Sequence, residues 1–244
     1  MGRQNFKPGT LHAPLPAVMA TVGDMENSNI ITVAWTGILS SDPPRTYISV
    51  RPSRHSHKML TDTAEFVINL TTERLAYATD YAGIYTGAKV DKFEKLGLGK
   101  IESSVVKAPT IAESPLALEC KVFDVLHFGT HDVFMADIVN VSCDDSLLDA
   151  NGKICLERAG LMAYSHGEYF ALGEKIGKFG FSAAKETKRA ASLVKSPKPT
   201  SAKKADDKNG EKERENAHVP FYEKYVKGSK GRTPCRKKGT KKGK

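Results

Sequence analysis

Short apolar runs separated by Gly, Pro, Asn and Asp dominate the first 180 residues, and this pattern predicts β-strands. Residues 116–126 alternate between apolar side chains and polar ones, so Glu119 and Lys121 should lie on the solvent face of a half-exposed strand. Residues 131–141 are apolar on both faces apart from Asp137, which predicts a central strand. Further strands are predicted at 16–23, 30–35, 45–50, 64–70 and 167–173.

Helix signals are fewer than strand signals. They occur at 54–62, for which Ser53 is a candidate N-cap, and at 71–83 and 91–97. Many short strands with few helices favour an antiparallel barrel over a doubly wound sheet. The sequence contains neither G-x-G-x-x-G nor G-x-x-x-x-G-K-[ST], which argues against Rossmann and P-loop nucleotide sites.

The charge is distributed unevenly along the chain. The net charge is +9, but residues 185–244 carry +13, from 20 Lys and Arg against 7 Asp and Glu, and the rest of the chain carries −4. This segment has little to bury, so we expect a globular domain at 1–181 and a disordered, Lys-rich tail at 182–244. Such a tail could bind nucleic acid or an acidic partner non-specifically, because it carries no RNP, KH or zinc-finger motif. The alternative is a solvated tail without a ligand.

The four cysteines include no C-x-x-C pair and show no metal-ligand spacing, so no metal site is expected. Cys120 falls on the apolar side of its predicted strand, which indicates a buried thiol in a reducing compartment. We find no signal peptide and no run of about 18 apolar residues. The expected location is cytoplasmic.

Two stretches suggest a binding site but each also has an ordinary explanation. Residues 51–58, RPSRHSHK, connect a predicted strand to a predicted helix, whose free N–H groups and flanking side chains suit a phosphate. The same stretch could be a solvated helix start. Trp35, Thr36 and Gly37 suit a flat heteroaromatic ligand, or else the tryptophan is buried and plugs one end of a barrel.

Six segments in register carry a resemblance to a known family: NIITVAWTGILSSDPP, YISVRPSRHSHKML, EFVINL, VDKFEKLGL, HDVFMADIVNV and AYSHGEYFALGEKIG. Over residues 10–180 the chain resembles the FMN-binding split-barrel family of flavin reductase-like proteins, and particularly its flavoredoxin-like branch. The resemblance implies a mainly β fold, an antiparallel split β-barrel of six or a similar number of strands with a few flanking helices. It also implies noncovalent FMN and a homodimer.

The resemblance further implies a role for individual residues. The cofactor-binding positions are Ala34, Trp35 and Thr36 at the flavin ring, Ser49, Val50 and Arg51 beside it, and Arg54, His55, Ser56 and His57 at the phosphate. Lys92 would be a further polar contact, unless it is a surface lysine. His131 matches a histidine near the flavin and would position substrate or donate a proton, whereas a structural role is its alternative. Tyr164 and His166 are weaker candidates.

Three functions follow from these expectations. The first is an FMN-dependent oxidoreductase that uses NADH or NADPH to reduce flavin or a small acceptor, by hydride transfer to flavin N5. The second is a flavoredoxin-like electron carrier that exchanges electrons with a redox protein and has no reductase activity of its own. The third is a scaffold whose basic tail binds nucleic acid or an acidic partner.

Overall fold

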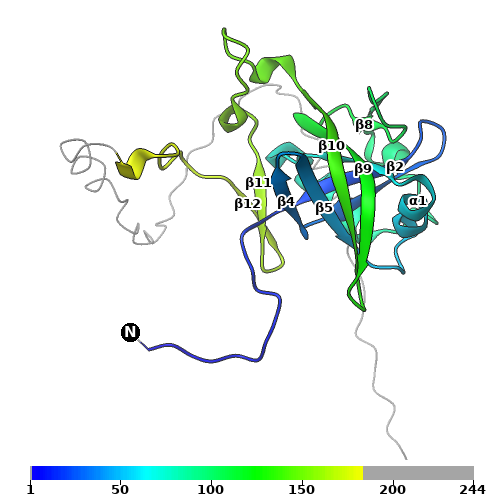
Figure 1. The fold of residues 1–244 in the computed structure, drawn as a ribbon, viewed down its shortest axis with the longest axis horizontal. Coiled ribbons are helices and arrows are strands. Elements are labelled where there is room, and N and C mark those ends of the chain that lie inside the picture. Colours follow the sequence, from blue (N-terminus) through cyan, green and yellow to red (C-terminus); the bar gives the residue numbers. More distant parts are fainter. Residues whose placement is uncertain (1, 184–244) are drawn as a thin grey trace, which may run out of the picture. The chain divides into compact units, whose positions relative to one another are not determined.

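A computed structural model describes residues 2–183, and the predicted tail therefore lies almost entirely outside the described residues (Figure 1). Seven strands form one antiparallel sheet in the order β3-β2-β6-β9-β10-β5-β4. These strands are β2 (Val18–Gly23), β3 (Ser28–Val33), β4 (Thr36–Ser41), β5 (Pro44–Val50), β6 (Glu65–Asn69), β9 (Leu116–His127) and β10 (Asp132–Cys143). The predicted mainly β, antiparallel fold with few helices is confirmed.

The sheet curls around one apolar core. Ile48, Phe66 and Phe134 are completely or almost completely buried in this core, and β10 lies between β9 and β5, as expected for a central strand. Trp35 follows β3, and its carbonyl accepts a hydrogen bond of 3.0 Å from the Ser49 amide of β5. This bond extends the β4–β5 pairing by one residue, and β3 also contacts β5, so the two ends of the curled sheet approach each other here; we call this place the seam.

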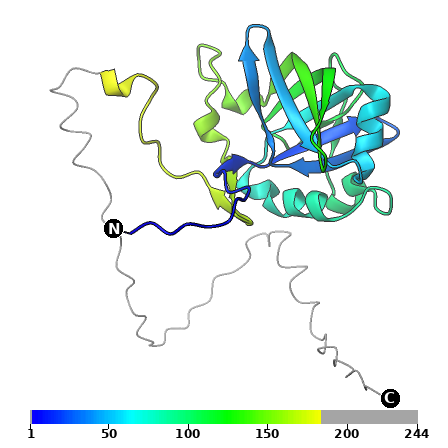
Figure 2. The same ribbon diagram turned by 60° about the horizontal axis from the view of Figure 1, so that its bottom comes forward.

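Among residues 2–183, three α-helices pack against the sheet: α1 (His55–Thr63), α2 (Ala76–Ile84) and α3 (Lys92–Leu96). From α1, Leu60 enters the central core. In contrast, α2 and α3 pack on the outer side of β2 and β3, where Ala82 and Phe93 join a second apolar cluster with Met19 and Ile30 (Figure 2). Single 3₁₀ turns are η1 (Glu73–Leu75), η2 (Asp145–Leu147), η3 (Leu156–Arg158) and η4 (Phe181–Ala183).

Two smaller sheets complete the described fold. One has the order β1-β11-β12, from β1 (Leu15–Pro16), β11 (Met162–Ser165) and β12 (Glu168–Ala171). The other pairs β7 (Lys100–Ile101) with β8 (Thr110–Ile111).

The structure differs from the sequence prediction at β4. The strand predicted at 30–35 ends at Val33, and a new strand, Thr36–Ser41, follows almost at once. This strand lies at the edge of the sheet and Ile38 is 67% exposed, so it lacks the alternation that reveals a half-buried strand. The large sheet therefore has seven strands, which agrees with the expectation of six or a similar number.

Two local predictions are wrong. The N-cap of α1 is Arg54, and no side chain makes the capping bond that Ser53 was expected to provide. Glu119 is 1% exposed, because the segment 104–106 crosses over it. Lys121, its predicted companion on the solvent face, is exposed.

The Glu119 carboxylate lies in a nest of hydrogen-bond donors. It accepts bonds from the amides of Ser104, Val105 and Val106 at 2.9, 2.6 and 3.1 Å, and from the Asn140 side chain at 2.7 Å. Burial acts to raise the pKa of Glu119, but these four donors together hold the pKa below its usual value. The carboxylate therefore anchors the β7–β8 connection to the sheet.

Cys120 is buried as predicted, and burial raises the pKa of its thiol to about 12. In residues 2–183 no helix has the length and apolar character needed to span a membrane. Nor does this part of the chain bring together three or more His, Cys, Asp or Glu side chains that could hold a metal ion.

Candidate functional site

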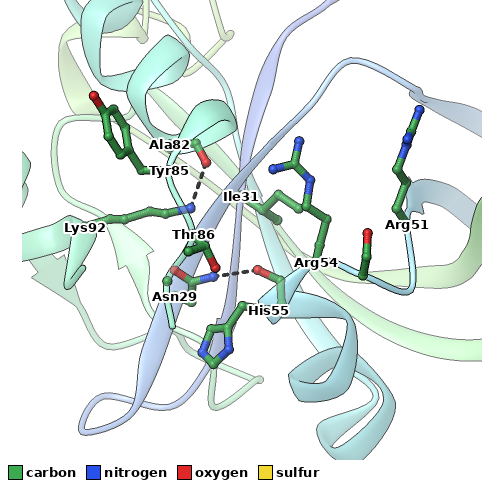
Figure 3. Close-up of a pocket in the computed structure, with 12 residues that line it drawn as sticks. Asn29, Ile31, Arg51, Arg54, His55, Ala82, Tyr85, Thr86 and Lys92 are labelled. Carbon is green, nitrogen blue, oxygen red and sulfur yellow. Dashed lines mark hydrogen bonds between the residues drawn. The ribbon is translucent and has the colours of Figure 1, made fainter. Parts of the chain in front are cut away.

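A cationic pocket of about 360 Å³ lies between β3, the turn that leads into α1, and the loop after α2 (Figure 3). We call it the basic pocket. Its lining residues are Asn29, Ile31, Arg51, Ser53, Arg54, His55, Ser56, Ala82, Tyr85, Thr86, Gly87 and Lys92. Figure 3 shows Lys92 and Asn29 on one side of the pocket and Arg51 and Arg54 on the other.

The turn before α1 is ordered by backbone and side-chain hydrogen bonds. The Arg54 amide donates to the Arg51 carbonyl at 3.0 Å, and the His57 amide donates to the Arg54 carbonyl at 2.9 Å. Ser56 is buried, and its Oγ accepts a bond of 2.7 Å from the Asn29 side chain (Figure 3). The turn thus brings the N-terminus of a nine-residue helix, with its free N–H groups, to the pocket.

Lys92 is a buried cation, 4% exposed, and is not the surface lysine that the sequence left open. Its Nζ donates to the carbonyls of Ile30 and Ala82 at 2.6 and 2.7 Å. Ala82 lies in the last turn of α2, where unpaired carbonyls attract a cation. Burial first, and the nearby Arg54 second, lower the pKa of Lys92 to about 8.

The basic pocket lacks a counter-charge within the described residues. None of its lining residues is an Asp or Glu. Within the same part of the chain, the side chains of Arg51, Arg54 and Lys92 take part in no ion pair. Three cations and a helix N-terminus around one cavity form a site for an anion, and a phosphate fits this donor set well.

A second pocket, of about 390 Å³, adjoins the first and lies at the seam. We call it the aromatic pocket. It is lined by Ala17, Ile31, Thr32, Val33, Ala34, Trp35, Ser49, Val50, Arg51, Arg54, Gly83, His131, Tyr164 and Tyr169. Ile31, Arg51 and Arg54 line both pockets, so the two form one continuous groove.

Trp35 and His131 form one end of the aromatic pocket. Trp35 is 38% exposed, so the reading of a buried tryptophan plug is wrong. Its ring lies 4.5 Å from the His131 ring, centroid to centroid, at 45°. Burial and the Arg51 charge lower the pKa of His131, although Asp132 opposes them, so this ring is neutral at pH 7.

Two tyrosines from the small sheet form another wall of the aromatic pocket. Tyr164 of β11 and Tyr169 of β12 meet edge to face, with centroids 5.4 Å apart. The Tyr169 hydroxyl donates to Asp80 of α2 at 3.3 Å. Burial and Asp80 raise the pKa of Tyr169 to about 12, so it remains a hydrogen-bond donor at neutral pH.

Most of the predicted site residues come together in this groove. Those that line it are Ala34, Trp35, Ser49, Val50, Arg51, Arg54, His55, Ser56, Lys92, His131 and Tyr164. Thr36 lines neither pocket, because it is buried and its Oγ1 donates to the Tyr47 carbonyl at 2.6 Å. His57 also lines neither pocket, and neither does His166, which lies in the β11–β12 turn.

Sequence reasoning missed the α2–α3 loop and Asn29. A Cβ atom at Gly87 would lie 2.2 Å from Asn29 Oδ1, so glycine is needed where this loop approaches β3. The dipeptide Thr86-Gly87 after a helix was the available signal. Tyr169 carried no signal of its own, since its role depends on how the small sheet lies beside α2.

The family comparison agrees with this geometry. The model of the Flavin reductase like domain matches residues 11–173, and the chain belongs to that family. An uncharacterized protein of Archaeoglobus fulgidus is 34% identical over 149 residues, which are 61% of this chain and 83% of that protein. A second relative is the reductase component of an FADH(2)-dependent resorcinol hydroxylase from a Rhizobium species. It is 25% identical over 171 residues, and the match covers 66% of this chain and 90% of that protein.

Among solved structures, the flavoredoxin of Desulfovibrio vulgaris (Miyazaki F) is similar to this chain. It is 29% identical, with a TM-score of 0.70, and the match covers 75% of this chain and all of the flavoredoxin. The fold class and the family resemblance read from the sequence are both confirmed.

Proposed function

We propose that this protein binds FMN in the groove and acts as an NAD(P)H-dependent oxidoreductase that reduces flavin or a small acceptor. One observation carries the proposal: a pocket of three cations without a carboxylate continues directly into a pocket lined by aromatic rings. FMN has this combination of groups, a terminal phosphate at one end and a flat three-ring system at the other. The kinship with flavin reductase-like proteins supports the same ligand.

The chain's own residues divide the work of binding. Arg54, Lys92 and the first turn of α1 hold the phosphate, and the Ser56–Asn29 bond fixes the turn. Trp35 and the backbone at Ser49 border the flavin ring, because they lie at the seam. When bound, FMN supplies the redox chemistry by exchanging a hydride with a reduced nicotinamide.

His131 is suited to orient the second substrate. Its Nδ1 lies 3.0 Å from Thr130 Oγ1, which leaves Nε2 without a hydrogen bond within residues 2–183. The ring is neutral and lines the aromatic pocket, so it can donate or accept one hydrogen bond at a carbonyl or amide group of the substrate.

Visible spectroscopy tests the function directly. The purified protein is titrated with FMN, separated from free flavin, and mixed without oxygen with NADH and in parallel with NADPH. The proposal expects retained flavin absorbance that bleaches with one of the two nucleotides. Absence of flavin retention would refute FMN binding altogether.

The alternative is an electron carrier, which the similarity to a flavoredoxin supports. Here flavin is retained but neither nucleotide bleaches it, whereas a chemical one-electron reductant does. The two functions share the groove and differ only in the source of the electrons, so this spectrum distinguishes them.

We further propose a homodimer. Large apolar side chains remain exposed on one half of the sheet, namely Ile38 and Leu39 of β4, Phe123 and Leu126 of β9, and Val139 and Val141 of β10. Exposed apolar groups in such number are typical of interfaces. Light scattering should give twice the chain mass, and Ile38→Asp with Val141→Asp should give a monomer, whereas Ile84→Asp on α2 should not.

A further inference from the structure

Two side-chain hydrogen bonds fix the first turn of α1, which brings Arg54 and Ser56 to the basic pocket. One is the bond between Ser56 and Asn29 of β3. The other joins His57 Nε2 to Asp132 Oδ2 at 2.7 Å. Since α1 has no side-chain N-cap bond, these two contacts join the backbone bonds at Arg54 and His57 in orienting its first turn.

Asp132 is the first residue of β10 and is 7% exposed. Its second oxygen, Oδ1, lies 2.7 Å from His127 Nδ1 at the end of β9. Both carboxylate oxygens are thus used. The hydrogen bond from His127 lowers the pKa of Asp132, burial raises it, the bond from His57 lowers it further, and the net effect is a lowered pKa.

His57 is held on its other side by the core. Its ring meets the Phe134 ring edge to face, with centroids 5.3 Å apart and planes at 72°. The His57 ring is therefore fixed between the Phe134 ring and the Asp132 carboxylate. Since both residues belong to β10, this ring holds the start of α1 in place relative to β10. Asp132 also pairs with Val50, the residue before Arg51, so the connection is short.

We propose that Asp132 is a positioning residue for the flavin phosphate: acting through His57, it holds the first turn of α1 where Arg54 and Ser56 reach the phosphate. This inference rests on the proposed function, and it gives His57 a supporting role in place of the direct phosphate contact expected from the sequence. Neither Asp132 nor His57 lines the groove, so neither touches the ligand there.

A positioning role differs measurably from a purely structural one. Riboflavin has the ring system of FMN but lacks the phosphate. If Asp132 only joined α1 to β10, its loss would change the affinities for both ligands alike. If it orients the phosphate turn, its loss lowers the affinity for FMN and leaves that for riboflavin unchanged.

The experiment measures dissociation constants of FMN and riboflavin by fluorescence quenching for the full chain and four variants. Asp132→Asn and His57→Ala should each weaken FMN binding about tenfold, the value of one charge-assisted hydrogen bond, with riboflavin unchanged. His57→Gln, whose amide can donate to the carboxylate, should restore much of the FMN affinity. The matched control is His127→Ala, which removes the other bond to Asp132 without touching α1 and should keep the wild-type ratio of FMN to riboflavin affinity.

The outcomes separate the two claims. An unchanged ratio of FMN to riboflavin affinity in both Asp132→Asn and His57→Ala, whether neither affinity falls or both fall equally, would overturn the positioning role and leave the proposed function standing. A wild-type protein that binds FMN no better than riboflavin would refute the phosphate site itself, and the inference with it. Thermal unfolding curves show which variants are folded. If Asp132→Asn does not fold, His57→Ala tests the same contact.

Discussion

The buried position of Lys92 makes FMN binding depend on pH. Burial and Arg54 lower the pKa of this lysine from 10.5 to about 8. A phosphate dianion in the basic pocket favours the protonated amine, so the flavin complex restores a higher pKa. FMN should therefore bind most tightly below pH 8 and more weakly as the pH rises through the pKa of the flavin-free protein.

The size of the effect follows from the proton population. About nine-tenths of Lys92 is protonated at pH 7 and about one-tenth at pH 9. If bound phosphate keeps the amine charged across this range, FMN affinity falls about tenfold between these two values. For folding the sign is opposite: the unfolded chain binds the proton more tightly, so the stability of the flavin-free protein should rise between pH 8 and about 10.4.

Fluorescence titrations of FMN at pH 7, 8 and 9 measure this dependence. Riboflavin is the ligand control, because it has no phosphate and its affinity should stay constant. Lys92→Arg is the protein control, since its guanidinium keeps its charge at all three values and should make FMN affinity independent of pH. A constant FMN affinity in the wild-type protein, or the same pH dependence in Lys92→Arg, would refute the assignment.

Three further results are expected. Arg54→Ala combined with Ser56→Ala should lower FMN affinity about a hundredfold, because a charged and a neutral phosphate contact are lost, whereas the charge-matched Lys58→Ala should not; a titration with FMN checks both. Glu119→Gln should destabilise the protein by about 3–5 kcal/mol, or about 10 °C in Tm, because it replaces a buried carboxylate that accepts bonds from four donors. Glu102→Gln is the exposed control. The difference in stability between Glu119→Gln and the wild-type protein should shrink in acid, as Glu119 takes up a proton. Deleting residues 185–244 should leave FMN affinity unchanged, since the groove is lined by residues from 17 to 169, and equilibrium dialysis against FMN would detect any loss.

Local pattern was enough to predict most of the sheet. Buried strands such as β10 have apolar runs that differ from the intervening turns, and residues at the start of α1, which were predicted to hold a phosphate, line the basic pocket. The family resemblance then pointed to Trp35 and Ser49 at the other end of the groove, which lie 14 positions apart in the sequence and meet at the seam.

What the sequence did not reveal depends on segments that meet across the fold. Glu119 looked solvent-exposed because nothing in the strand itself indicates that 104–106 crosses over it. The family resemblance placed His57 at the phosphate, and no local pattern indicates its bond to Asp132, which is 75 residues away. Thr36 belongs to an unpredicted strand and turns to the Tyr47 carbonyl. In each case, hydrogen bonds to residues of another segment determine where the side chain lies.

The seam has a consequence for how the protein holds its shape. The aromatic pocket takes residues from β3, at one edge of the sheet, and from β5, the strand next to the other edge, so any ligand seated there contacts both ends of the sheet. Such a ligand binds only while these two parts of the sheet are together. Local opening of the barrel at the seam therefore requires that the ligand first dissociates, and opening becomes rarer as the ligand concentration increases. The Ser49 amide donates to the Trp35 carbonyl at the seam, so its hydrogen exchange should be slower in the protein with bound ligand than in the ligand-free protein. The fraction of protein with bound ligand and the protection of the Ser49 amide from exchange should therefore rise together.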